Sequence, residues 1–136
     1  MLRTLVIAAT VGILGTTPGN AQSAHDVVAA HNSAYQSGDY SAYMEMFDEN
    51  AVINLDGLMI QGRDAIAANY AANFRADGPT VRILRQGRVA GGGIIQQEAY
   101  VRADGEEVCC SVTTFRVRDG LIVRLDINSS GLQLGG

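Results

Sequence analysis

Three polar side chains stand at places where they could carry acid–base chemistry, namely His31, Asn54 and Asp56. His31 falls on the apolar face of a helical pattern, and the free pKa of an imidazole lies near neutral pH. It is therefore the natural candidate for a catalytic acid or base, although a histidine on such a face is also commonly a core residue. Asn54 and Asp56 end a short apolar strand, where they could finish a turn or supply a catalytic carboxylate.

The charge of the chain limits the partners that it can have. It has 136 residues, a net charge of −4 and ten basic residues, all of which are arginine. The arginines are scattered, and the closest group (Arg82, Arg85 and Arg88) fits a solvated strand edge as well as it fits a patch. Nucleic-acid binding therefore has little support in the sequence.

The two cysteines, Cys109 and Cys110, are adjacent. Neighbouring residues of a strand point to opposite faces, so we expect two small buried side chains rather than a disulfide. Neither the cysteines nor the two histidines have the spacing of a zinc site. The sequence therefore predicts no metal and no cofactor.

The first residues have the pattern of a targeting segment. A short positive start precedes an apolar run over 4–15, and small residues follow. This pattern predicts a signal peptide over 1–21, with cleavage after Ala21 or Ser23, and an exported protein that is periplasmic or secreted. An uncleaved membrane anchor is the other interpretation, but the run is shorter than the roughly 20 residues that a spanning helix needs. We expect no stable membrane insertion after cleavage.

One domain over 24–129 and a flexible glycine-rich tail over 130–136 should follow the signal. Helical periodicity fills the first half of the domain, where Gly38 ends the first helix and Asp39 caps the second. The sequence predicts three helices, and a short strand between the second and the third: 24–37, about 40–47, 63–75, and the strand 51–55.

The second half of the domain has the period-two alternation of strands. Gly91–Gly93 and two Asp-Gly turns separate four alternating runs: 80–90, 94–103, 107–117 and 121–128. Helices followed by an antiparallel meander predict an α+β domain, in which the helices cover one face of a curved sheet.

The ordered set of these features resembles the nuclear transport factor 2-like superfamily, particularly its SnoaL-like and ketosteroid-isomerase-like branch. The resemblance covers about 27–127, and the residues that carry it are Gly38-Asp39, Met46-Phe47, Asp48 to Val52, Gly62-Arg63-Asp64-Ala65-Ile66, Val81-Arg82 and Asp119-Gly120. It implies a cone-shaped, barrel-like fold, with three N-terminal helices packed on the concave face of a curved antiparallel sheet. It also implies a homodimer formed through the outer face of the sheet.

The resemblance bears on the catalytic residues. Ketosteroid isomerases use an aspartate base, and a tyrosine and a protonated aspartate form their oxyanion hole. Alignment puts Leu55 at the base, His31 at the tyrosine and Thr113 at the protonated aspartate. None of the three is retained, so ketosteroid isomerisation by that mechanism is not expected. Asp56 lies one residue from the base position, where strand alternation directs it away from the cavity unless a bulge turns it inward.

The same alignment gives the expected lining of the cavity. Its inward positions are mainly apolar with a few polar groups, which suits one small, largely hydrophobic ligand. His31 is the expected catalytic residue, Asp56 is a weaker candidate, and the expected ligand-binding residues are Tyr35, Ile53, Leu55, Tyr70, Gln97, Ser111, Thr113 and Phe115. On the outer face, an apolar stripe of Cys110, Val112, Tyr100 and Val123 supports the homodimer.

Three functions fit this sequence. One is a cofactor-free isomerase, lyase or cyclase that uses His31. The others are a non-catalytic periplasmic binding protein for an apolar metabolite, and an interaction module whose cavity is incidental. The missing carboxylates argue against the first and the polar groups of the pocket argue against the last. The sequence favours an exported protein that binds a small apolar molecule, and it leaves catalysis open.

Overall fold

The computed structural model describes residues 23–129, so the predicted signal peptide and tail lie outside the described residues. The described chain begins with helices, and its helical elements are α2 (Ala24–Ser37), α3 (Tyr40–Glu45), α4 (Arg63–Tyr70) and the short 3-10 helix η2 (Ala71–Phe74). Within this part of the chain, no helix is long and apolar enough to cross a membrane. Three helices were predicted, and the first has the predicted bounds.

The junction between α2 and α3 forms as the sequence predicts. Gly38 has a φ of 76°, the left-handed conformation that a glycine adopts at little cost, and it ends α2. The carboxylate of Asp39 then accepts a hydrogen bond from the backbone N–H of Ala42 (3.1 Å) and so caps α3. Helix α3 is shorter than predicted, because the chain enters a strand at Phe47.

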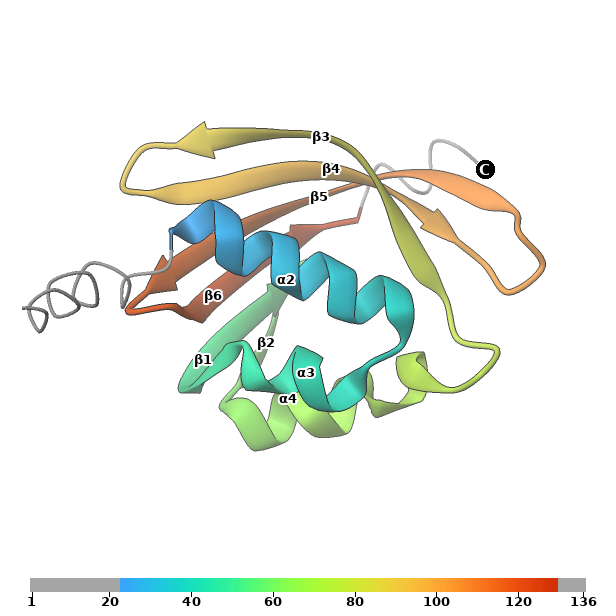
Figure 1. Ribbon diagram of the computed structural model, residues 1–136, viewed down its shortest axis with the longest axis horizontal. Coiled ribbons are helices and arrows are strands. Elements are labelled where there is room, and N and C mark those ends of the chain that lie inside the picture. The colour runs from blue at the N-terminus through green and yellow to red at the C-terminus, as the bar shows by residue number, and fades with distance from the viewer. Residues whose placement is uncertain (1–22, 130–136) are drawn as a thin grey trace, which may run out of the picture.

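The sheet has six strands: β1 (Phe47–Leu55), β2 (Leu58–Gln61), β3 (Thr80–Val89), β4 (Gly93–Val101), β5 (Glu107–Arg118) and β6 (Leu121–Asn128). Their order is β2-β1-β6-β5-β4-β3, so the sheet is open, with β2 and β3 at its edges. Figure 1 shows how it curves around the helices. The predicted α+β class and the curved sheet are confirmed.

Two features of the sheet go beyond the prediction. Strand β2 has only four residues, and its exposed Leu58 and Met59 hide the alternation by which strands are recognised. The pairing of β1 with β6 is parallel, so the sheet is mixed rather than wholly antiparallel. Hairpin signals are local, whereas β1 and β6 are brought together over the length of the domain, so their relative direction does not show in the sequence.

The helices lie on the concave face of this sheet. Helix α2 contacts β3, β4 and β5, and α4 contacts β1 and β2 (Figure 1). Fully buried side chains from both layers form the core between them: Val27, Val28, Phe47, Ile53, Ile66, Phe115 and Ile122. Burial of one such side chain contributes about 1.5–3 kcal/mol.

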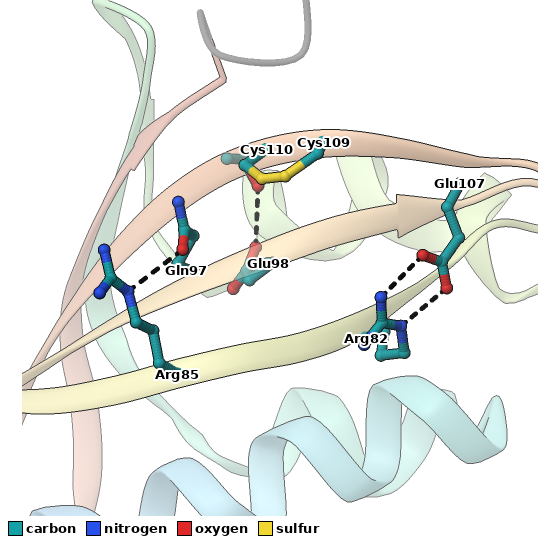
Figure 2. Close-up of a disulfide and its surroundings, with 8 residues drawn as sticks. Arg82, Arg85, Gln97, Glu98, Glu107, Cys109 and Cys110 are labelled. Atoms are coloured by element: carbon teal, nitrogen blue, oxygen red, sulfur yellow. Dashed lines mark hydrogen bonds and ion pairs between the residues drawn. A yellow bond between two sulfur atoms is a disulfide. The ribbon is translucent and has the colours of Figure 1, made fainter. Parts of the chain in front are cut away.

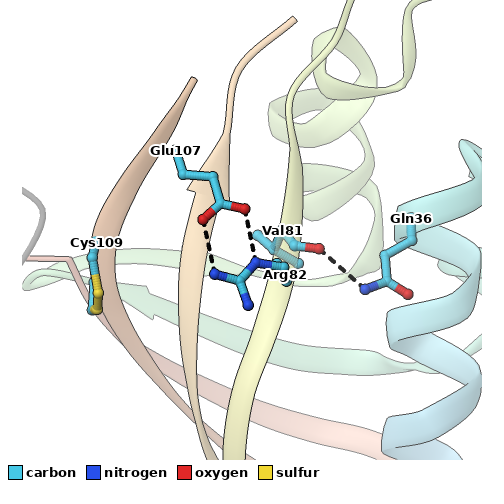
Figure 3. A network of polar contacts seen from close by, with 6 residues as sticks. Gln36, Val81, Arg82, Glu107 and Cys109 are labelled. Atoms are coloured by element: carbon cyan, nitrogen blue, oxygen red, sulfur yellow. Dashed lines mark hydrogen bonds and ion pairs between the residues drawn. A yellow bond between two sulfur atoms is a disulfide. The ribbon is translucent and has the colours of Figure 1, made fainter. Parts of the chain in front are cut away.

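A hydrogen bond ties the end of α2 to the edge of the sheet. The side-chain amide of Gln36 donates to the backbone carbonyl of Val81 on β3 (3.1 Å), as Figure 3 shows. The next residue, Arg82, points the other way and forms a two-pronged ion pair with Glu107 at 2.7 and 2.9 Å. That pair is exposed and screened by solvent, so it adds little to stability. The contact of Gln36 fixes the distance between α2 and β3, which enclose one side of the cavity.

Candidate functional site

A cavity of about 350 Å³ lies between the helices and the concave face of the sheet. Its volume is at the lower end of the range for small-molecule pockets. Five aliphatic side chains, four tyrosines and eight other polar side chains line it: Leu55, Ile60, Val81, Leu125, Ile127, Tyr35, Tyr43, Tyr70, Tyr100, His31, Asn32, Asn69, Asn73, Glu98, Ser111, Thr113 and Ser129. Polar and apolar side chains thus lie together in its wall.

Glu98, on β4, is the only acidic or arginine side chain among these lining residues. It is 8% exposed, and both of its carboxyl oxygens are hydrogen bonded. Oε2 accepts from Nε2 of Gln96 (2.6 Å), and Oε1 accepts from the hydroxyl of Ser111 (3.0 Å). Burial raises the pKa of Glu98, and hydrogen bonds from Gln96, Ser111 and Thr113 oppose that rise. A carboxyl in this environment is suited to acid–base chemistry.

A buried chain of amides leads away from Glu98. Gln96 and Asn32 exchange two hydrogen bonds: Asn32 Nδ2 donates to Gln96 Oε1 (2.9 Å), and Gln96 Nε2 donates to Asn32 Oδ1 (3.0 Å). Gln96 Oε1 also accepts from Nε2 of Gln86 (2.9 Å). The amide of Gln96, which is 1% exposed, thus uses both of its hydrogens and both of its lone pairs.

The inward position expected for Gln97 is wrong. In the hairpin of β4 and β5, Gln96 pairs with Thr113 and Glu98 pairs with Ser111. Directly paired residues share a face of the sheet. Gln97 therefore faces outward, where it accepts a hydrogen bond from Arg85 at 3.2 Å (Figure 2).

Sequence reasoning missed Glu98 because it placed β4 one residue out of register. The glycine-rich turn before the strand does not fix the pairing, and the ladder itself shifts between Glu98 and Ala99. A usable signal was present, since Glu98 is the one charged residue in the otherwise uncharged segment 93–101. An acidic residue in such a strand needs hydrogen-bond partners if it is buried, so it is a candidate site residue.

The expectation for the cysteines is also wrong. Cys109 pairs with Ala99 while Ser111 pairs with Glu98, so Cys110 is the extra residue of a bulge. The bulge breaks the strict alternation on which the expectation of two separate, buried thiols rested. Instead a disulfide joins the two cysteines, and Cys109 is exposed (Figure 2).

His31 lines the cavity but is enclosed by aromatic rings. Its ring centroid lies 4.7 Å from that of Tyr43 and 5.0 Å from that of Phe115. Nδ1 lies 3.4 Å from Oδ1 of Asn32, and Nε2 is buried without a hydrogen-bond partner among the described residues. Burial lowers the pKa of His31 from 6.5 to about 4, and the hydrogen bond with Asn32 offsets part of this effect. The imidazole is therefore neutral at neutral pH.

The tyrosines supply hydroxyl groups. Burial raises the pKa of Tyr35 and of Tyr43, and it raises that of Tyr70 to about 12. These phenols therefore keep their protons at neutral pH and can donate hydrogen bonds to a ligand. Tyr35 also accepts a hydrogen bond from Asn73 at 3.2 Å, which orients its oxygen.

The remaining expected site residues divide into two groups. Leu55, Ser111 and Thr113 line the cavity with Tyr35 and Tyr70. Ile53 and Phe115 point inward as expected, but they are fully buried in the core and are not among the lining residues.

Asp56 lies outside the cavity. It is exposed in the turn between β1 and β2, with a φ of 51°, and it accepts hydrogen bonds from the backbone N–H (2.8 Å) and the hydroxyl of Ser129. These two hydrogen bonds lower the pKa of its carboxyl. Its position is that of a turn residue that fastens the end of β6.

The outer face of the sheet differs from the expectation at Tyr100. Tyr100 lines the cavity and does not belong to the outer stripe, for the same reason of register that moved Gln97. Val112 does face outward, in a second hollow of about 350 Å³ that Ile95, Gln97 and Arg85 also line. In residues 23–129 no group of three or more histidine, cysteine, aspartate or glutamate side chains is placed to hold a metal ion.

Comparison with solved structures shows the same fold in several bacterial proteins. A proposed polyketide cyclase from Sinorhizobium meliloti is 25% identical, with a TM-score of 0.66 over 76% of this chain and 94% of that one. An NTF2-like protein of unknown function from Mesorhizobium loti is 26% identical, with a TM-score of 0.66 over 77% and 88%. A Mycobacterium tuberculosis protein in complex with estradiol-17β-hemisuccinate is 21% identical, with a TM-score of 0.66 over 78% and 93%.

No curated protein matches the sequence at a significant level. The SnoaL-like domain, in contrast, matches residues 28–125, which is well over half of the chain and includes every strand from β1 to β5 and most of β6. This protein therefore belongs to the SnoaL-like family, within the NTF2-like fold.

Proposed function

We propose that this chain is an exported protein that binds a small, uncharged and largely apolar molecule in its cavity, and that Glu98 acts on that molecule as a general acid or base. The observation that carries the proposal is a buried carboxyl group in the wall of a cavity that no arginine and no other acidic side chain lines. No cofactor is invoked, because Glu98 and the surrounding hydroxyls supply the groups that a proton transfer needs.

The charge of the lining argues for a neutral ligand. Glu98 is the one formally charged residue of the lining, and no arginine lines the cavity to balance an anion. A buried negative charge beside Glu98 would be strongly unfavourable. Apolar side chains such as Leu55, Leu125 and Ile127 favour a hydrocarbon skeleton, and the polar groups of the lining favour one or two oxygen atoms.

The polar groups suit a proton transfer next to a carbonyl. Glu98 can remove a proton from such a carbon and return it elsewhere, as an isomerisation, an elimination or a cyclisation requires. The protonated hydroxyls of Tyr35, Tyr43 and Tyr70 can donate to the oxygen that gains charge. His31 is a poorer base at neutral pH than a free imidazole, because burial lowers its pKa to about 4.

A non-catalytic binding protein is the second candidate. The carboxyl of Glu98 already accepts hydrogen bonds from Gln96 and Ser111, and a carboxyl so engaged can be structural. Among the similar structures, one is a proposed polyketide cyclase and another is in complex with a steroid derivative.

Export and dimerisation are further parts of the proposal. Export rests on the apolar run near the N-terminus, which favours a periplasmic or secreted protein. A homodimer through the outer face of the sheet is supported by the hollow at Ile95 and Val112, where apolar side chains lie outside the core of one chain.

A compact cyclic ketone tests the proposal directly. We would add 2-tetralone to the protein in D₂O and follow deuterium exchange at its acidic carbons by NMR, with wild type and Glu98→Gln. Wild type should catalyse exchange, and Glu98→Gln should slow it by about 100-fold or more while binding persists. Glu49→Gln, which alters an exposed glutamate, is the matched control.

The outcomes separate the two candidates. Binding of neutral ketones without exchange would favour the binding protein. A cavity that takes no member of a panel of neutral ketones and steroids would contradict the proposal.

A further inference from the structure

We infer that Gln96, held by Asn32, is a positioning residue for Glu98: it occupies the Oε2 atom as a hydrogen-bond donor, so that the proton Glu98 exchanges is carried on Oε1, beside Ser111. This inference rests on the proposed function, in which Glu98 transfers a proton. The contacts that support it do not depend on the identity of the ligand.

The hydrogen bond at Oε2 fixes the orientation of the Gln96 amide. Nε2 of Gln96 lies 2.6 Å from Oε2 of Glu98, within hydrogen-bonding distance. An amide nitrogen can only donate, so Oε2 must accept. A proton placed on Oε2 would meet an N–H group head-on. Oε1 faces the hydroxyl of Ser111 (3.0 Å), which can donate to a carboxylate or accept from a carboxylic acid.

The rest of the amide chain agrees with this orientation. With Nε2 turned to Glu98, Oε1 of Gln96 faces the amide nitrogens of Asn32 and Gln86, both at 2.9 Å. Reversal of the Gln96 amide alone would break all four of its hydrogen bonds. The side chain is 1% exposed, so no solvent is available to replace them.

The contact between Asn32 and His31 follows from the same orientation of the amides. Oδ1 of Asn32 accepts from Gln96 at 3.0 Å, so the amide oxygen is the atom that faces Nδ1 of His31 at 3.4 Å. An oxygen acceptor requires the hydrogen of the neutral imidazole to be on Nδ1. The acceptor Oε2 of Glu98 therefore sets the direction of donation along these hydrogen-bonded side chains, and the tautomer of His31 reports that direction.

Titratable groups from the three helices and from β4 line the same cavity as Glu98. Helix α2 contributes Tyr35 and His31, α3 contributes Tyr43, α4 contributes Tyr70, and β4 itself contributes Tyr100. All are neutral at neutral pH or keep their protons, because burial raises the pKa of the phenols and lowers that of His31. A change in the titration of Glu98 after a substitution at Gln96 therefore reports the lost hydrogen bond rather than a charged neighbour.

Carboxyl ¹³C NMR of the purified full chain tests the inference without a ligand. In Gln96→Leu, the pKa of Glu98 should rise by about one pH unit or more, a tenfold higher proton affinity, because the charged form loses its strongest donor. Asn32→Leu should give a smaller rise, since Gln96 remains but is held at its oxygen by Gln86 alone. Gln97→Leu is the matched control: the same substitution at the adjacent residue, on the outer face, should leave the titration unchanged.

A second measurement needs no variant, which matters if Gln96→Leu does not fold. ¹⁵N NMR of His31 in the wild type should show the hydrogen on Nδ1. A hydrogen on Nε2, or an unchanged titration of Glu98 in a folded Gln96→Leu, would overturn the inference. If the wild type does not catalyse ketone exchange but both NMR results are as expected, the proposed function is contradicted and the hydrogen-bonding role of Gln96 stands.

Discussion

The imidazole of His31 stands edge-on to the ring of Phe115, with centroids 5.0 Å apart and ring planes at 77°. This contact places the ring in the core rather than in the open part of the cavity. Its other close ring neighbour, Tyr43, is itself almost fully buried. A protonated imidazole here would have little compensation for lost hydration, which explains why burial lowers the pKa of His31 to about 4.

The first prediction concerns stability in acid. In the folded state His31 takes up a proton only near pH 4, whereas in the unfolded chain it does so near 6.5. The folded pKa is depressed, so the contribution of neutral His31 is fully present above pH 6.5 and is lost as the pH falls toward 4. The free energy of unfolding should drop by up to about 3 kcal/mol over this window.

Urea denaturation at several pH values measures this slope. His31→Phe, which keeps a ring in the aromatic cluster, should remove most of it. His25→Phe is the control, because His25 is exposed on the same helix. Equal slopes in wild type and His31→Phe would mean that His31 is not the group that titrates.

The second prediction concerns Glu98, whose contribution to stability changes with pH in the opposite direction to that of His31. Burial raises the pKa of Glu98 above 4.5, so the unfolded chain releases this proton at a lower pH than the folded protein. The contribution of Glu98 is fully present below pH 4.5 and is lost as the pH rises through its folded pKa. Glu98→Gln, which cannot ionise, should therefore gain stability relative to wild type as the pH rises.

The comparison is made by urea midpoints of wild type and Glu98→Gln at about pH 5 and about pH 8. The same substitution at the exposed Glu49 should give parallel profiles. If the difference between wild type and Glu98→Gln does not change with pH, the carboxyl of Glu98 is not destabilised by burial.

The order of the elements could be read from the sequence because its signals are local. Gly38 and Asp39 mark the junction of two helices by backbone conformation and capping, and the alternating runs after residue 80 mark the strands. The SnoaL-like resemblance then supplied the three-dimensional arrangement. Tyr35, Leu55 and Thr113 lie within elements that these signals define, and the structure has all three in the lining of the cavity.

Glu98 could not be placed because its face depends on strand register. One residue of slip exchanges the two faces of a strand, and the turns on either side of β4 allow either register. The bulge at Cys110 and the pairing of β1 with β6 are likewise set by contacts between distant residues. The chemically most informative residue of the cavity was therefore assigned to the wrong face, while its outward neighbour Gln97 was expected in the site.

A third prediction tests the close packing at the start of β4. A Cβ atom on Gly93 would lie 2.7 Å from the backbone oxygen of Phe115 and 2.7 Å from a methyl group of Val89. Gly93→Ala should destabilise the fold by about 1–3 kcal/mol, because the backbone of β5 must move. Gly87→Ala, on the facing strand, would meet only a methyl group at 3.8 Å and should be tolerated. Thermal unfolding of both variants decides, and equal midpoints would show that this turn can relax.

The last prediction concerns the outer face of the sheet. Val112 lies in the outer hollow beside Ile95, and in the proposed homodimer its side chain contacts a second copy of this face. Val112→Arg would bury a charge without a counter-ion there, so the dimer should dissociate while the chain remains folded. Light scattering gives the mass, and circular dichroism checks the fold. Ala103→Arg, at an exposed position in the turn between β4 and β5, is the control for the added charge. A dimer that persists in Val112→Arg would place the interface on another surface. A wild-type monomer would contradict the proposed homodimer.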